Sequence, residues 1–557
     1  MVNTFLKDNY KPLLFLFLTW GLYFIIYWHF VFFLSDNGDL TAGWRIIWAD
    51  WAFHLSQAHA FAYQPFLHVL NNNPIYAGSP IAYPFATNLI SGLLIKSGVN
   101  VVAAFVVPSI LYSLLLILTL YVFGKLITNT ATAAVLGIFL FLLSGGIEFI
   151  YYLTDIVKDP TIGNIIYPPH HYSFLEERGF YWKSVLLSSL IPQRAMLLGM
   201  PWMLISLSFL FVHYRSGFAK VRPVSMFAAG MFAGFLVIVH THSLMVLFII
   251  CVCMFVTDLK HYRQWLSFAL GVATTSLPWI PFLTGENTIG FFGIVPGWYA
   301  HESQLGESVL AFWLRNWGLF FPMVFIALFM TFTGRGRQWL CSNKIRFGKE
   351  RTIYVPFLLL FILANLFRFQ PHLWDNTKLF LWSCMGFSFL VAQLVVALFD
   401  KGRLMKGVGV ILVVLMCFSG LIDIVKSMHV HRESHVMVPA DLIELGKKLR
   451  DMSEPDDIIM SSSNHLNFAS TVTGRGVLKG YDGWLWSYNI DYRGREADIR
   501  KIYRGDSSYR TLLQKYSIDY VVLDRSAEEE YGADRSFLNN HFEYVMGAGT
   551  TAVYRIE

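Results

Sequence analysis

The sequence has few charged residues and few cysteines for its length. Charged side chains make up 14% of its 557 residues, whereas a soluble protein usually carries about 25%. Five cysteines occur, and none follows Cys417. No Cys-x-x-Cys pair and no Cys/His spacing typical of zinc is present. The composition therefore argues against a soluble protein, a disulfide-bonded C-terminal region and a structural zinc site.

Long apolar runs are what the sequence has instead. Hydrophobic residues make up 55% of the chain and aromatic residues 17%, and a membrane span needs roughly 20 apolar residues. Eleven stretches qualify as spans: residues 12–34, 99–126, 131–153, 194–213, 223–240, 241–257, 264–284, 309–332, 353–368, 377–399 and 407–425. The first lacks the cleavage site of a signal peptide, so we expect it to be retained. The pattern predicts a mostly α-helical polytopic membrane protein.

The basic residues predict the orientation of these spans. If the N-terminus, with Lys7 and Lys11, is cytoplasmic, every strongly basic short loop falls on the same side of the membrane, as the positive-inside rule requires. The formal net charge of +6 then reflects orientation and gives no indication of nucleic-acid binding. The loops at 35–98 and 154–193 and the C-terminal region would lie outside the cytoplasm. We expect a multi-pass protein of the plasma (inner) membrane.

A change in hydropathy after residue 425 predicts a second domain. We expect a transmembrane domain over residues 1–425 and a small extracytoplasmic α/β domain over 426–557, which is a normal domain size. Helical spacing over 439–452 and 507–517 predicts two helices. The β-rich runs at 457–462 and 519–524 predict strands, and 542–557 predicts a closing hairpin.

Residues 474–506 of this region are rich in aromatic side chains. The stretch "GRGVLKGYDGWLWSYNIDYRGREADIRKIYRGD" combines glycines, tyrosines, tryptophans and charges. Aromatic faces stack on apolar sugar faces, so Tyr481 and Trp484 are candidates for substrate binding. A second interpretation, equally weighted, is a loop that packs onto the membrane domain.

The first outer loop carries a conspicuous acid. In "ADWAFHL", helical spacing places Asp50 and His54 on one face, one turn apart. Residues 46–62 are predicted to form an amphipathic helix in the membrane interface. The turn-rich stretch "NNNPIYAGSPIAYPF" and the short apolar run 86–97 follow. The loop is therefore expected to double back onto the membrane.

This arrangement resembles the GT-C glycosyltransferases, polytopic enzymes that move a sugar from a polyprenyl-phosphate or polyprenyl-diphosphate carrier to an acceptor outside the cytoplasm. "ADWAFHL" followed by "AGSPIAYPF" is similar to the acidic motif and the Pro/Tyr-rich turn of protein mannosyltransferases and aminoarabinose transferases, and to the Asp-aromatic motif of oligosaccharyltransferases. Asp50 matches the acid. Trp51 stands where mannosyltransferases carry a second acid. The number of spans, the large first outer loop and the outer C-terminal domain extend the resemblance over the whole chain.

The resemblance implies a reaction that needs only a general base and cations that bind phosphate. An acceptor hydroxyl attacks the anomeric carbon with inversion in a single displacement, and a carboxylate, expected to be Asp50, takes its proton. Cations hold the departing phosphate. Candidate substrate-binding residues near the outer ends of spans or in the outer loops are His54, Arg194, His240, His242, Arg315, Arg368, Asp375 and Lys378. The alternatives are cations that extend to lipid headgroups and histidines that cap helix ends. We expect Asp50 to share one pocket with Arg194 and Lys378.

A divalent metal is a further candidate. Oligosaccharyltransferases carry a second acidic motif in the second outer loop, and Glu176-Glu177 is an inexact match to it. Candidate ligands of Mg²⁺ or Mn²⁺, which favour oxygen, are Asp50, His170, His171, Glu176 and Glu177. The alternative is no metal, as in mannosyltransferase-like members.

Two other functions fit parts of the sequence. A transporter or flippase of lipid-linked sugars would explain the charges within spans, but no two related halves are visible. A non-catalytic assembly subunit would use the C-terminal region as a scaffold, but it leaves Asp50 unexplained. Glycosyl transfer from a polyprenyl-phosphate sugar to a protein or glycan acceptor is the favoured function.

Overall fold

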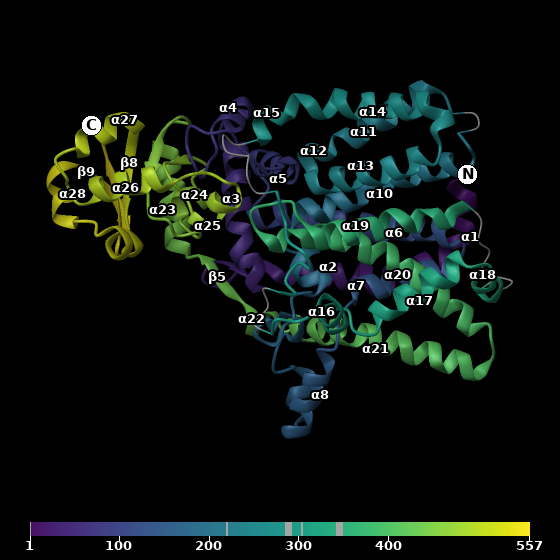
Figure 1. Cartoon of the computed structure of the whole chain (residues 1–557). Helices are drawn as coiled ribbons and strands as arrows, with labels where there is room; N and C mark the ends of the chain where they lie inside the picture. The colour runs from purple at the N-terminus through teal and green to yellow at the C-terminus, as the bar shows by residue number, and fades with distance from the viewer. Residues whose placement is uncertain (1, 219–220, 285–291, 302–304, 341–348, 557) are drawn as a thin grey trace. The chain divides into compact units, whose positions relative to one another are not determined.

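The protein was analysed as a computed structural model that describes residues 2–218, 221–284, 292–301, 305–340 and 349–556 (Figure 1). Most of these residues are helical. The chain forms two compact units: unit 1 comprises Met1–Tyr27, Ile110–Leu277 and Phe292–His429, and unit 2 comprises Trp28–Ser109, Pro278–Phe291 and Val430–Glu557. The predicted boundary at residue 426 remains a prediction.

Six described helices are long and apolar enough to cross a membrane: Lys7–Val31, Val101–Thr128, Arg194–Arg215, Leu259–Leu283, Leu373–Phe399 and Arg403–Ser427. The pair α16 (Val309–Asn316) and α17 (Phe320–Phe332), bent by 104°, would add a seventh. Shorter apolar helices cover Ala131–Leu142, Pro223–Val239, Thr241–Val256 and Arg351–Leu366. The chain is therefore a multi-pass membrane protein. Each of the eleven predicted ranges overlaps one of these helices, while the span count and the orientation remain predictions.

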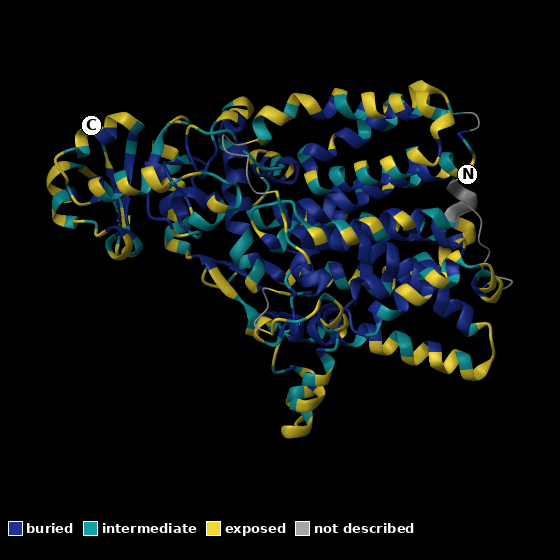
Figure 2. Ribbon diagram, viewed as in Figure 1, coloured by how far each residue is buried: buried dark blue, intermediate teal, exposed yellow. Residues whose placement is uncertain are grey.

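Unit 1 is built around α20 (Thr377–Phe399), whose apolar stretch is entirely buried (Figure 2). It packs against α7 (Ala131–Leu142), α17, α19 (Tyr354–Leu366) and α21 (Arg403–Ser427). Two glycines allow this close packing. A Cβ at Gly124 or Gly137 would lie 2.3 Å from the ring of Phe389, so only glycine leaves room for that side chain. Small residues at helix crossings are typical of membrane helix packing.

The other helices and strands of unit 1 surround this centre or connect its spans. They are α1 (Val2–Leu16), α8 (Phe149–Lys158), α9 (Ile162–Ile166), α10 (Arg194–Arg215), α11 (Pro223–Gly234), α12 (Leu236–Val239), α13 (Thr241–Val256), α14 (Tyr262–Ser276), α18 (Gly334–Leu340), β3 (Gly293–Ile294) and β4 (Phe367–Arg368). Two helices, α2 (Leu22–Val31) and α6 (Val101–Thr128), continue from one unit into the other.

Unit 2 contains two sheets. In the first, β2 (Leu40–Ala42) lies between β1 (Phe32–Leu34) and β5 (His435–Val438), all antiparallel. The second has the order β7-β6-β8-β10-β9, made of β7 (Gly476–Val477), β6 (Ile458–Met460), β8 (Ile518–Leu523), β10 (Thr551–Arg555) and β9 (Glu543–Ala548). Strands β7, β6 and β8 are parallel to one another, and β10 is antiparallel to both β8 and β9. The predicted strands and hairpin therefore exist.

Helices α26 (Arg493–Tyr503), α27 (Tyr509–Tyr516) and α28 (Arg535–His541) pack on the five-stranded sheet. They share with it a core that includes Ile499, Ile502 and Val521. Unit 2 also contains α23 (Ala440–Met452), α24 (Phe468–Thr471) and α25 (Asp482–Ser487). The helices predicted at 439–452 and 507–517 correspond to α23 and α27.

The loop at 35–98, predicted to lie outside the cytoplasm, folds into α3 (Arg45–Tyr63), α4 (Phe66–Asn71) and α5 (Ala86–Lys96) of unit 2. The helix predicted at 46–62 exists, but the prediction that it is amphipathic is wrong, while its position in the membrane interface remains a prediction. Most of α3 after Trp51 is buried because α5 packs along it: a Cβ at Gly92 would lie 2.6 Å from the carbonyl oxygen of Ala58.

Candidate functional site

Asp50 lies on α3 and is half-buried. One turn later the ring of His54 is buried, and its Nδ1 lies 3.1 Å from Oδ1 of Asn88 on α5. The amide of Asn88 in turn donates to Gln57 Oε1 at 2.7 Å. These two contacts of Asn88 fix the His54 side chain, which lies on the same face of α3 as Asp50.

Trp51 explains the departure from the two-acid motif. Its side chain is fully buried and stacks on Trp28 with the ring centroids 5.7 Å apart. Edge contact with Phe32, at 5.0 Å, completes the packing. An acid at this position would be buried among aromatic rings, so the residue next to Asp50 serves the core of unit 2.

The aromatic stretch 474–506 packs against α3. Phe53, one turn after Asp50, contacts Trp484 at 5.5 Å and Tyr488 at 5.3 Å between ring centroids. Trp484 is half-buried in this cluster, whereas Tyr481 is 40% exposed. The packing interpretation thus describes much of the stretch, while Tyr481 is accessible and the role of Tyr481 and Trp484 in substrate binding remains a prediction.

His465 also belongs to this aromatic group, and no motif in the sequence predicted it. Its ring makes an edge contact with Trp48 on α3 at 4.5 Å and a tilted contact with Tyr481 at 5.4 Å between ring centroids. Trp48 is held by a hydrogen bond of 3.1 Å from its Nε1 to the Val436 carbonyl oxygen of β5. Burial lowers the pKa of His465, so its ring is neutral at neutral pH. We call Trp48, His465, Tyr481 and Trp484 the aromatic patch.

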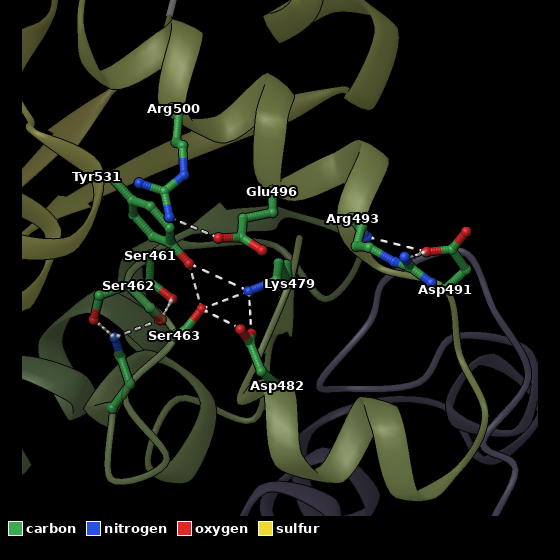
Figure 3. Close-up of polar contacts among 11 residues, drawn as sticks. Ser461, Ser462, Ser463, Lys479, Asp482, Asp491, Arg493, Glu496, Arg500 and Tyr531 are labelled. Atoms are coloured by element: carbon green, nitrogen blue, oxygen red, sulfur yellow. Dashed lines mark hydrogen bonds and ion pairs between the residues drawn. The ribbon is translucent and has the colours of Figure 1, made fainter.

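A buried lysine lies at the centre of a polar network beside this segment of the chain (Figure 3). The Lys479 ammonium, fully buried, donates to Ser463 Oγ at 2.6 Å and pairs with Asp482 at the start of α25. It also donates to the Tyr531 hydroxyl at 3.3 Å. Because Tyr481 and Trp484 flank Asp482 in the sequence, the network holds the chain segment that carries both aromatic residues. In the sequence, only the three-residue spacing of Lys479 and Asp482 indicated it.

Unit 1 holds a basic cluster, which we define as Lys183, His240, His242, His372 and Lys378. Lys378 Nζ lies 3.0 Å from Oδ1 of Asp375 and interacts electrostatically with His240 and His242. His372 interacts with both lysines, and burial lowers the pKa of His372. The structure thus brings together four residues that were singled out in separate segments of the sequence: His240, His242, Asp375 and Lys378.

Lys183 is the member of the cluster that sequence analysis missed. It pairs with Glu176 and lies 4.4 Å from the ring centroid of Trp374. It stands in the apolar stretch "FYWKSVLL", where an isolated lysine was the only signal. Glu176, predicted as a metal ligand, is therefore engaged as the counter-ion of Lys183.

The histidines also have structural roles. His240 caps α13: its Nδ1 accepts the Ser243 backbone N–H at 3.3 Å. Gly199 on α10 approaches the same ring, since a Cβ there would lie 2.4 Å from His240 Cβ. The capping interpretation is thus correct for His240, which leaves its Nε2 for other partners.

The three predicted arginines lie in different surroundings. Arg194 is fully buried at the start of α10 and interacts electrostatically with Tyr112 of α6. Arg315 makes a two-pronged ion pair with Glu307, with N–O distances of 2.9 and 3.0 Å. Arg368 is half-buried on β4, which pairs with β3.

The predicted metal ligands do not form a group. His170 and Glu177 are exposed, whereas His171 lies within electrostatic range of the buried Asp423 on α21. Within residues 2–218, 221–284, 292–301, 305–340 and 349–556, no set of three His, Cys, Asp or Glu residues is arranged to hold a metal ion. Asp50 belongs to unit 2 and the other four to unit 1. The five predicted ligands thus do not form a metal site among the described residues.

An apolar groove runs between α13 and α14 in unit 1. It has a volume of about 570 Å³ and is lined by side chains such as Leu244, Leu247, Phe248, Trp265 and Val272. Leu244 follows His242 by two residues, so the groove reaches the turn of α13 that carries His242, on another side of the helix. An apolar groove of this kind can hold an apolar chain.

Comparison with known proteins defines the fold. The whole chain aligns with 75% of an oligosaccharyltransferase from Archaeoglobus fulgidus tethered to an acceptor peptide, at a TM-score of 0.53 and 11% identity. The same archaeal enzyme, AglB, in complex with an inhibitory peptide and a dolichol-phosphate gives 0.52 and 12% over 99% of this chain and 75% of that one. ArnT from Cupriavidus metallidurans aligns over 97% of both chains at 0.47 and 10%.

The two archaeal similarities show that the chain has the GT-C fold, as the acidic motif and the layout of the sequence predicted. No protein-family model matches the sequence, and no curated protein matches it. The fold is therefore established through structure, at sequence identities of 12% or below.

Proposed function

We propose that this protein is a GT-C glycosyltransferase that moves a sugar from a polyprenyl-phosphate-linked donor to an extracytoplasmic acceptor. The observation that carries the proposal is the full-length fold similarity to AglB, a protein whose structures contain a dolichol-phosphate and acceptor or inhibitory peptides. The proposal places the N-terminus in the cytoplasm and residues 426–557 outside it, with eleven spans.

The donor's carrier is assigned to unit 1. The basic cluster offers two ammonium groups and imidazole N–H groups, which suit an anionic phosphate. Each lysine already has a carboxylate partner, but an ammonium has three donors and can bind a phosphate beside it. The groove between α13 and α14 would receive the polyprenyl chain, because burying an apolar chain against apolar side chains is favourable. Arg194 is a further candidate for the phosphate because it is a buried guanidinium at the outer end of a span.

The chemical step is assigned to Asp50. The acceptor hydroxyl oxygen forms a bond to the anomeric carbon while the bond from that carbon to the phosphate oxygen breaks. The proton passes from the hydroxyl to the Asp50 carboxylate, and the electron pair leaves with the phosphate. Inversion follows from this single displacement. His54 is assigned to substrate binding on the same face of α3.

The acceptor is a protein or a glycan. Tyr481 and Trp484 of the aromatic patch would contact it or the transferred sugar, because aromatic rings pack against the apolar faces of sugars. Arg315 and Arg368 are secondary candidates for substrate binding. Arg315 would have to exchange Glu307 for the substrate, which makes it the weaker of the two.

Substitution of Asp50 tests this proposal. A strain lacking the gene is complemented with wild-type protein, Asp50→Asn or Asp36→Asn, an exposed acid in the same outer loop, and cell-envelope proteins and glycans are compared by mass spectrometry. A sugar mass increment should return with wild type and Asp36→Asn and be absent with Asp50→Asn at equal protein level.

Binding separates an enzyme from its competitors. Purified Asp50→Asn should bind dolichyl phosphate or undecaprenyl phosphate as wild type does, because the carboxylate acts in the chemical step. If the sugar increment persists with Asp50→Asn, the catalytic role is refuted. If wild type produces no increment but moves a lipid-linked sugar across vesicle membranes, the protein is a flippase.

A further inference from the structure

Helix α8 and the short helix α9 expose an unusual number of aliphatic side chains. Ile150, Leu153 and Val157 of α8, and Ile162, Ile165 and Ile166 of the segment that follows, are between 45% and 81% exposed. We call these six residues the aliphatic face. Monomeric soluble surfaces rarely gather apolar side chains in this way. We therefore expect lipid or another molecule to cover these six side chains.

The other side of α8 is polar or packed. Tyr152 is buried and its ring lies 6.2 Å from that of Phe418 on α21. Asp155 accepts a hydrogen bond of 2.8 Å from the Tyr172 hydroxyl, and Lys158 is exposed to solvent. Residues 150, 153 and 157 follow helical spacing, so α8 is amphipathic with a single aliphatic side.

The contacts of α8 place it at a definite depth beside α21. Phe418 and Ile422, which pack with Tyr152, precede the end of α21 at Ser427 by roughly 8 to 14 Å at 1.5 Å per residue. A 25-residue helix is about 38 Å long and exceeds a hydrocarbon core of about 30 Å by a few ångström at each end. This contact therefore lies roughly 4 to 10 Å inside the edge of the hydrocarbon core, the depth to which interfacial helices bury their apolar side.

The direction of α8 fits the same location. Within unit 1, α20 and α21 run nearly side by side, whereas α8 extends across their direction (Figure 1). A helix that crosses the spans at the edge of the hydrocarbon lies along the plane of the membrane. An amphipathic helix in that plane buries its apolar side in the acyl-chain boundary.

We infer that α8 and α9 form an interfacial anchor whose aliphatic face is covered by the membrane lipids at the Ser427 end of α21. Lipid is favoured over a protein partner because the face is made of Ile, Leu and Val, while the residues that dominate protein interfaces are Trp, Tyr and Arg. The anchor would tie the segment that carries His170 and His171 to the membrane surface.

Site-specific photo-cross-linking tests this inference. p-Benzoylphenylalanine replaces Val157, Lys158 or Leu111 in the full chain, which is reconstituted in vesicles of phosphatidylethanolamine and phosphatidylglycerol and irradiated. Leu111 is the positive control, because it is exposed on a span. Val157 is 81% exposed, so its replacement removes no packing.

The expected result is a lipid adduct at position 157, seen as an added phospholipid mass, with a yield close to that at 111 and at least fivefold above that at 158. A covalent dimer at 157 would show that a second copy of the chain covers the face. No adduct at 157, with a normal yield at 111, would show that water covers it. Either of these two results overturns the inference.

Discussion

At the scale of single residues, burial decides which titratable groups carry charge. His59 on α3 is buried, and its Nδ1 lies 3.1 Å from the Leu55 carbonyl oxygen. Burial, aided by the nearby positive charge of Arg450, lowers the pKa of His59 to about 4. The native state thus holds a neutral imidazole that the unfolded state protonates near its ordinary value of about 6.5.

This difference predicts acid sensitivity. The stabilisation from a neutral His59 is complete above pH 6.5 and is lost as the pH falls toward 4, because the unfolded chain binds the extra proton. Between pH 7 and pH 5 the loss should be about 2 kcal/mol. Thermal unfolding of wild type and His59→Gln in detergent measures this loss. The difference in unfolding free energy between the two proteins should be smaller at pH 5 than at pH 7. An equal difference at both pH values would refute the prediction.

The Lys479 network predicts an asymmetry between its two charged partners. The lysine is fully buried while Asp482 is 39% exposed. Asp482→Ala leaves a buried ammonium without its counter-ion, whereas Lys479→Met leaves a carboxylate that water can reach. Removing one partner of a buried pair is strongly destabilising. Asp482→Ala should therefore lower the free energy of unfolding by about 3 kcal/mol, and Lys479→Met by less.

Thermal unfolding of the two variants measures this asymmetry. The exposed pair Arg525–Glu529 is the control, since Glu529→Ala should change stability by less than about 1 kcal/mol. Equal losses in Lys479→Met and Asp482→Ala would show that the network is held by its hydrogen bonds to Ser463 and Tyr531 and not by charge.

At the scale of elements, the centre of unit 1 depends on a fit between glycines and one ring. Gly137→Ala places a Cβ 2.3 Å from Phe389, so α7 and α20 must separate or the ring must move. Overpacking of this kind typically costs about 1–3 kcal/mol. We expect a lower midpoint of thermal unfolding for Gly137→Ala.

The double variant Gly137→Ala, Phe389→Leu checks the cause. Because leucine lacks the ring, the added Cβ should cost less in the Phe389→Leu background than in wild type. Gly407→Ala on α21 is the control, since no atom lies within 4 Å of a Cβ there. Additive effects of the two substitutions would contradict the proposed clash.

The elements that the sequence predicted best are those with a strong period. Apolar length located the helices of the membrane region, and the β-rich run 519–524 located β8. The burial of α3 could not be predicted in this way. The spacing of its polar and apolar residues suggests a helix with one polar side, but α5 and β5 pack against it and bury it from several directions. Tertiary packing by segments distant in the sequence carries no local signal.

The candidate site shows the same limit. Asp50 stood out because an acid follows a span, and Lys378 because it lies among charges at a span end. Lys183 and His465 acquire interest only from what the fold places beside them, Trp374 and Trp48 respectively. Whether the predicted residues act on substrate remains a prediction that the variants above test.

At the scale of the whole molecule, the proposed function divides its work between two compact units. Unit 1 would bind the carrier phosphate, and unit 2 would supply the base and the aromatic patch. This division predicts that the two activities can be lost separately. Lys183 is suited to a test of phosphate binding, because it belongs to the basic cluster and its side chain is only 17% exposed.

Lys183→Met should weaken the binding of dolichyl phosphate or undecaprenyl phosphate about tenfold, since a hydrogen bond to a charged group is worth about 1.5–3 kcal/mol. Titration calorimetry of the purified protein in detergent measures the dissociation constant. Lys158→Met is the matched control, because Lys158 is exposed on α8 and lies outside the basic cluster. Asp50→Asn should leave the constant unchanged, although it abolishes transfer. If Lys183→Met and Lys158→Met bind the lipid equally well, the basic cluster does not hold the phosphate, and the carrier must be sought at Arg194.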